Sequence, residues 1–128
     1  IERYHDIMDT MKTPIDVLDE AREIQIKKGN DYQNPNSNIR QSDYYPRGCS
    51  TILDIMTGKI LRMRSVIEAM ESDPNYKPNF ESLEDSAVDL INYSSFFASY
   101  INSGIDGQDS GRDFLNRKID DETKRRTP

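Results

Sequence analysis

The sequence has only one cysteine, Cys49, and one histidine, His5. A lone cysteine excludes an intrachain disulfide. Neither residue stands in a pattern typical of a catalytic nucleophile, so we do not expect nucleophilic catalysis. No apolar run approaches the roughly 20 residues needed to cross a bilayer, and no signal-peptide pattern is visible. These absences predict a cytoplasmic protein that does not act in a membrane.

Apolar residues are also scarce, because only 34% of the 128 residues are apolar whereas 31% are charged. This length suits a single domain. The composition favours amphipathic helices, which a partner subunit completes by covering their remaining apolar surface. The net charge of −6 argues against nonspecific binding to nucleic acid, which needs a broad basic face.

Strand signals and internal repeats are absent, while helical periodicity recurs along the chain. Residues 1–12 carry a short apolar face. Thr13, Pro14 and Asp16 form an N-terminal capping pattern that predicts a helix over 14–28, ending before Gly29. Apolar residues then recur at helical spacing over 51–71 and again over 80–103. We therefore predict an all-α helical bundle.

The connections between these helices define the domain. Only about eight residues separate the last two helices, so we expect an antiparallel hairpin. The capping pair for its first helix is Thr51 and Asp54. Residues 30–48 form a long Asn- and Pro-rich loop, which is usually functional or disordered. A single helical domain is thus expected over 1–104, followed by a charged tail over 105–128 that is weakly ordered or forms one short helix.

Asp89 is the most informative polar residue because it borders a long uncharged stretch of its helix. A carboxylate among Val88, Leu90 and Ile91 is expected to be partly buried, and a buried charge needs a partner. Folding the hairpin brings Lys59 or Arg62 to the level of Asp89. One interpretation is therefore a structural ion pair, whose net stabilisation is often small.

A second interpretation is a metal site. Glu20 and Glu23 share one face of the helix over 14–28, and can meet Asp85 and Asp89 across the bundle. Carboxylate oxygens suit Mg²⁺ or Mn²⁺, which bridge to phosphates. Aromatic residues at helical spacing, in contrast, favour the core or a subunit interface: Tyr93, Phe96, Phe97 and Tyr100.

Three segments together resemble a known family. They are AREIQIKKGNDY at 21–32, KILR at 59–62 and EDSAVDLINY at 84–93. This pattern resembles the phage and bacterial nucleotide modification associated domain 1 family, over about residues 15–103. That family looks like a relative of the MazG-type all-α nucleoside triphosphate pyrophosphohydrolases. The resemblance implies a MazG-like helical bundle, and a location in the host cytoplasm if the protein is phage-encoded.

The resemblance also implies site residues. MazG-type enzymes bind Mg²⁺ through an E-x-x-E and an E-x-x-D, and Asp89 matches the last acid whereas Asp85 matches the first only loosely. The resemblance thus implies catalytic roles for Asp85 and Asp89. A metal site rebuilt with the two glutamates of the helix over 14–28 would have the ligands Glu20, Glu23, Asp85 and Asp89, with Glu23 as a further catalytic residue. The implied nucleotide-binding residues are Lys28, Asp31, Tyr32, Lys59, Arg62, Asn92 and Tyr93.

One departure from the family pattern keeps three functions open. Lys59 and Arg62 stand where a MazG enzyme carries two glutamates, so cations replace metal ligands. The first expectation is a homodimer or homotetramer that hydrolyses a (deoxy)nucleoside triphosphate to monophosphate and pyrophosphate with Mg²⁺ or Mn²⁺. The second is a noncatalytic protein that binds or sequesters nucleotides, with the two cations contacting phosphate. The third is a structural interaction module.

Overall fold

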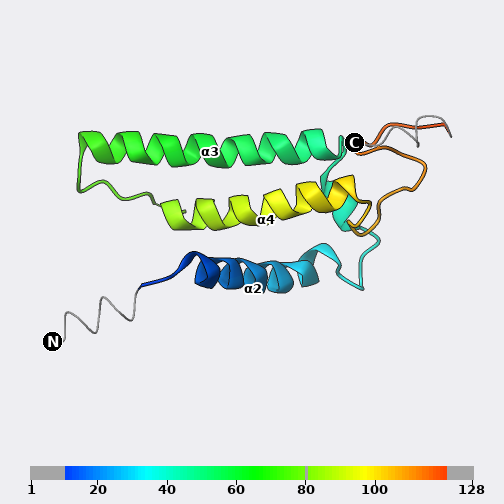
Figure 1. The fold of residues 1–128 in the computed structure, drawn as a ribbon, viewed down its shortest axis with the longest axis horizontal. Coiled ribbons are helices and arrows are strands. Elements are labelled where there is room, and N and C mark those ends of the chain that lie inside the picture. Colours follow the sequence, from blue (N-terminus) through cyan, green and yellow to red (C-terminus); the bar gives the residue numbers. More distant parts are fainter. Residues whose placement is uncertain (1–10, 80, 121–128) are drawn as a thin grey trace.

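The computed structural model describes residues 11–79 and 81–120 of the chain. Its elements are α2 (Pro14–Tyr32), the short 3-10 helix η1 (Gln41–Tyr44), α3 (Cys49–Ser72) and α4 (Leu83–Ile101), as Figure 1 shows. Within the described ranges there is no strand, only an isolated bridge between Arg112 and Lys118. The predicted all-α class is confirmed. Residues 1–10, which carry most of the apolar face predicted over 1–12, lie outside the described part.

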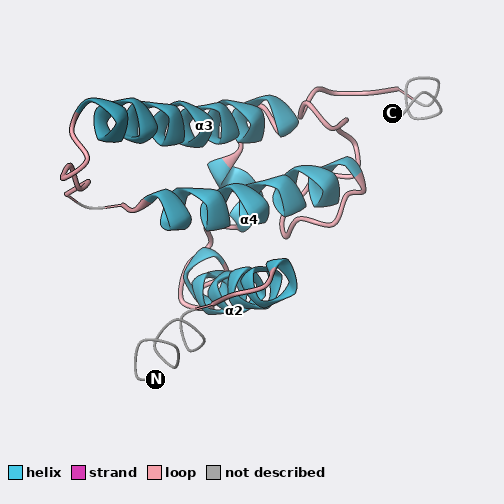
Figure 2. Ribbon diagram, turned by 60° about the vertical axis from the view of Figure 1, so that its left-hand side comes forward, coloured by secondary structure: helices cyan, strands magenta, loops and turns pink. Residues whose placement is uncertain are grey.

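The three long helices form a layer with α4 in the middle. α4 packs against α3 on one side and against α2 on the other, and both views show this order (Figures 1 and 2). α3 and α4 run in opposite directions, so the predicted antiparallel hairpin is confirmed. A single layer leaves each outer helix with one covered side, which explains why large apolar side chains of α2 and α3 remain exposed.

The predicted start of α2 is confirmed, but its predicted end is wrong. The Thr13 hydroxyl accepts a hydrogen bond from the Asp16 amide, and the Asp16 carboxylate accepts one from the Thr13 amide. The helix does not stop at Gly29 and continues to Tyr32. The ring of Tyr32 packs edge-on against Tyr44, with ring centroids 5.1 Å apart, and this long-range contact supports the extra turn.

The hairpin helices also have boundaries that differ from the prediction. α3 begins at Cys49, and the Thr51 hydroxyl accepts a hydrogen bond from the Arg47 amide in place of the predicted capping pair with Asp54. α4 begins at Leu83 instead of residue 80, because Ser82 caps the helix together with Asp85. The capping role of Ser82 satisfies orphan amides of the first turn.

The core lies where the start of α3 and the end of α4 meet the 30–48 loop and the C-terminal segment. Its buried members are Tyr45, Cys49, Ile52, Phe96, Tyr100 and Ile105. Tyr93 and Phe97 pack against this cluster, so the core assignment of the four aromatic residues of α4 is confirmed. The 30–48 loop therefore contributes to the core through Tyr45, which is 1% exposed.

The described part of the C-terminal segment, 105–120, contains no helix, unlike the short helix that was one predicted alternative. It forms turns that lie against the core through Ile105, Phe114 and Leu115. The Phe114 carbonyl accepts a hydrogen bond from the Cys49 amide at 2.8 Å, and Arg40 binds Asp106 through two hydrogen bonds. The apolar residues of this segment are too few to show periodicity, so only long-range contacts place it.

Among the described residues, no helix has the length and apolar content required to cross a membrane.

Candidate functional site

A cleft of about 480 Å³ opens between α2 and α4, near the start of α4. Seven residues line it: Glu20, Ile24, Lys28, Glu81, Asp85, Val88 and Asp89. Three of the four predicted metal ligands and one predicted nucleotide-binding lysine therefore share this cleft. Glu23 does not line it and is exposed.

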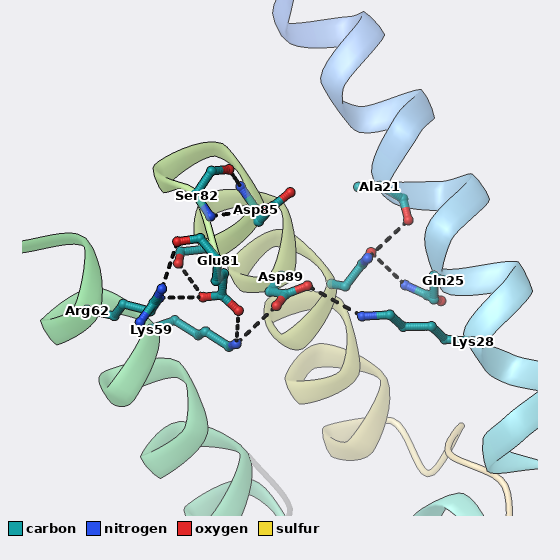
Figure 3. Close-up of polar contacts among 11 residues, drawn as sticks. Ala21, Gln25, Lys28, Lys59, Arg62, Glu81, Ser82, Asp85 and Asp89 are labelled. Atoms are coloured by element: carbon teal, nitrogen blue, oxygen red, sulfur yellow. Dashed lines mark hydrogen bonds and ion pairs between the residues drawn. The ribbon is translucent and has the colours of Figure 1, made fainter. Parts of the chain in front are cut away.

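Asp89 stands at the centre of a charge network that joins three helices (Figure 3). Its carboxylate is 21% exposed, with one oxygen 3.0 Å from the Lys59 amine and the other 3.7 Å from the Lys28 amine. The predicted ion pair with Lys59 is confirmed. Arg62, the alternative partner, pairs with Glu81 instead. One carboxylate of α4 thus holds cations from α3 and α2.

Glu81 is the second anion of this network, and it was missing from the predicted site residues. Its carboxylate lies 3.0 Å from the Lys59 amine and 3.1 Å from Arg62 Nε, and it accepts a hydrogen bond from the Ser86 hydroxyl. Arg62 also donates to the Glu81 carbonyl at 2.7 Å. Helical spacing does not place Glu81, because it precedes Ser82, the N-cap of α4.

The network shifts the pKa values of Glu81 and Lys59. The Ser86 hydroxyl hydrogen bond lowers the pKa of Glu81 below its usual range; burial opposes this shift, while Lys59 and Arg62 reinforce it. Burial disfavours the charged form of Lys59, but its hydrogen bonds to Asp89 and Glu81 outweigh burial and raise its pKa. Both groups are therefore held in their charged forms at neutral pH.

The carboxylates of the cleft already have partners within the protein. Asp85 caps its own helix by accepting from the Ser82 amide, and Glu20 pairs with Lys12. Asp89 is already neutralised by lysines. Within the described ranges, no group of three or more His, Cys, Asp or Glu side chains is placed to hold a metal ion. A divalent cation would have to compete with these partners for the carboxylate oxygens.

The other predicted binding residues lie beside the cleft without lining it. The Asn92 amide is 7% exposed and ties α4 to α2, because it donates to the Ala21 carbonyl and accepts from Gln25. Burial, reinforced by the neighbouring Tyr32 hydroxyl, raises the pKa of Tyr93. The structure thus brings Tyr32 and Tyr93 together, whereas Asp31 is exposed and outside the cleft.

The lowered pKa of Glu81 predicts a loss of stability in acid. Because its pKa in the folded protein is below the usual value of 4.5, its contribution is present above pH 4.5 and is lost as the pH falls through the folded pKa. We expect the free energy of unfolding, measured by urea titration, to fall less steeply between about pH 5 and about pH 3 in Glu81→Gln than in the wild type.

The matched control for this experiment is Glu68→Gln, which changes an exposed acid of α3. It should keep the acid sensitivity of the wild-type protein. Equal slopes for the wild type and Glu81→Gln in that range would contradict the assigned role of Glu81.

No family model, curated protein or solved structure matches this chain. The resemblance to the nucleotide modification associated domain 1 family therefore stays a prediction, carried by the three sequence segments.

Proposed function

We propose that this protein binds a nucleotide, with its phosphates at the cleft between α2 and α4. The observation that carries the proposal is the arrangement of Lys28 and Lys59 around Asp89, at one end of the cleft that Lys28 lines. A lysine that lines the cleft, beside a second lysine that binds the same carboxylate, suits a ligand with several negative oxygens.

The two lysines would play different parts. Lys28 is 56% exposed and lies 3.7 Å from Asp89, a long and exposed pair of the kind that contributes little to stability. Its amine can turn to a phosphate at small cost. Lys59 is 23% exposed and holds both Asp89 and Glu81, so it positions the network. Lys28 is therefore the residue proposed to contact phosphate.

A second hollow supports a nucleotide over a simple phosphate. It measures about 300 Å³, starts at Gly29 beside Lys28, and is lined by Gln25, Ile26, Gly29, Asn30, Tyr32, Gln33, Gln41 and Phe96. Amide groups supply donors and acceptors, and aromatic rings supply flat apolar surface. This combination fits the polar edges and the faces of a nucleobase.

Hydrolysis to a monophosphate and pyrophosphate with Mg²⁺ or Mn²⁺ is the second candidate function. The observation in its favour is that Glu20, Asp85 and Asp89 line the same cleft. Against it, these carboxylates are occupied by lysines or by a helix cap. The arrangement therefore favours binding without turnover, the noncatalytic alternative, and hydrolysis is an outcome for the experiment to detect.

The proposal predicts that Lys28→Ala weakens nucleotide binding about tenfold, the cost of losing one charge-assisted hydrogen bond. The control is Lys27→Ala, which removes the neighbouring exposed lysine of α2, outside the cleft lining. Calorimetric titration with ribo- and deoxynucleoside mono-, di- and triphosphates, each with and without Mg²⁺, measures the affinity, and a pyrophosphate assay on the same samples detects turnover.

The outcomes separate three functions. Binding that Lys28→Ala weakens and Lys27→Ala leaves intact supports a nucleotide-binding protein. Pyrophosphate release that requires the metal and is lost in Asp89→Asn identifies the hydrolase. Failure of every nucleotide to bind contradicts the proposal, and leaves the charge network as the core of a structural interaction module.

A further inference from the structure

The cleft between α2 and α4 differs in charge from one end to the other. The two helices run in the same direction, so residues that come early in both lie at the same end (Figure 1). Glu20 precedes Lys28 by eight residues, about 12 Å along α2. Glu81 and Asp85 likewise precede Asp89. Lys28 and Asp89 therefore mark one end of the cleft. The other end, called the acidic end below, consists of Glu20, Glu81 and Asp85.

Lys28 is the only cation among the described residues that line this cleft. The cations that bind Glu81 are Lys59 and Arg62, which belong to α3 and are not part of the lining. A negative group of a ligand is therefore attracted to the Lys28 end. At the acidic end it meets carboxylates on the cleft surface, and the cations that offset them lie farther away.

The other two carboxylates of the acidic end are also only partly offset. Lys12 lies 2.9 Å from Glu20 and 2.7 Å from Glu84, so one cation serves two carboxylates. Asp85 caps the start of α4, where its charge offsets the positive pole of that helix. The acidic end therefore retains an excess of negative charge.

We propose that the preferred ligand of this cleft in the absence of a divalent cation is a nucleoside monophosphate, an inference that rests on the proposed nucleotide binding. The hollow proposed for the base lies on later residues of α2 than the cleft does, from Gln25 to Tyr32. A base in that hollow places the first phosphate at Lys28. Further phosphates extend away from the base, toward the acidic end, and each brings negative charge close to its carboxylates. The preferred ligand thus differs from the triphosphate that the family resemblance implies.

The experiment compares the mono- and triphosphates of adenosine, guanosine, cytidine, uridine and thymidine by calorimetric titration. EDTA is present to remove divalent cations, which would neutralise phosphate charge and bridge it to carboxylates. For each base that binds, we expect the monophosphate to bind about tenfold more tightly than the triphosphate at low salt. This ratio should fall toward one as the salt concentration rises from about 0.05 M to about 0.5 M, because screening weakens the repulsion.

Two matched variants each neutralise one acid of α2. Glu20→Gln removes a carboxylate of the acidic end and should reduce the preference for the monophosphate about threefold, by tightening the binding of the triphosphate. Asp19→Asn removes the neighbouring exposed carboxylate, which lies outside the cleft lining, and should leave the preference unchanged. Circular dichroism should show that both variants keep the helix content of the wild type.

Three results would overturn this inference and leave nucleotide binding intact. A triphosphate that binds in EDTA as tightly as the monophosphate would show that the added phosphates avoid the acidic end. A preference that salt does not change would indicate exclusion by shape instead of charge. Equal effects of Glu20→Gln and Asp19→Asn would place the phosphates outside the cleft. Failure of every nucleotide to bind is a different result, because it contradicts the proposed function itself and this inference with it.

Discussion

Replacing Lys59 with methionine should destabilise the protein by about 2 kcal/mol. The substitution keeps the length of the side chain and removes its charge, so Glu81 and Asp89 lose the cation that lies 3.0 Å from each of them. These carboxylates are 25% and 21% exposed, and water therefore compensates only part of the loss. Urea denaturation at neutral pH measures the change in the free energy of unfolding.

Two further proteins show whether the charge network causes this loss. Lys27→Met changes an exposed lysine of α2 in the same way and should alter stability by less than about 0.5 kcal/mol. In the double variant Lys59→Met with Asp89→Asn, one of the two carboxylates that lose the lysine is also neutralised. Its destabilisation should be smaller than the sum of the single effects. Strict additivity would show that the two side chains do not interact.

Replacing Gly48 with alanine should destabilise the protein by roughly 2 to 4 kcal/mol. Gly48 precedes α3 with φ of 57° and ψ of −126°, a conformation that residues with a side chain rarely adopt. An added methyl group would also collide with the Phe114 carbonyl and approach the Tyr100 ring to 2.8 Å. Because the Phe114 carbonyl accepts a hydrogen bond from the Cys49 amide, the collision would disturb the start of α3.

Gly58→Ala is the matched control for this second prediction. Gly58 lies inside α3, and a methyl group there meets no atom within 4 Å. Alanine favours helix over glycine, so this variant should be more stable by about 0.5 to 1 kcal/mol. Thermal and urea unfolding should show a lower free energy of unfolding for Gly48→Ala and a higher one for Gly58→Ala than for the wild type. A Gly48→Ala protein as stable as the wild type would show that the connection before α3 tolerates another conformation.

The candidate site was predictable where the argument needed only position along a helix. The position of Asp89 at the edge of an uncharged stretch predicted a partly buried carboxylate, and the hairpin then brought Lys59 opposite it. Glu81 was harder to assign, because it lies just before the N-cap Ser82 and has no helical neighbours on its N-terminal side. Its role depends on where the chain enters α4, and helical period does not determine that point.

The metal prediction shows a different difficulty. Spacing placed Glu20, Glu23, Asp85 and Asp89 on faces that can meet, and three of them do line one cleft. Spacing does not show which partner each carboxylate takes. Asp85 is used by the capping box of α4, and Asp89 is used by two lysines. Competition among nearby partners is decided by three-dimensional proximity.

The sequence by itself determined the all-α class, three amphipathic helices, the hairpin of α3 and α4 and the capped start of α2. These features follow from contacts within a few residues, which repeat with the period of the helix. Only the tertiary structure decided the start of α3, the extra turn of α2 and the packing of residues 105–120. Each of these depends on one contact between distant segments, such as the Phe114 carbonyl with the Cys49 amide, and such contacts leave no period in the sequence.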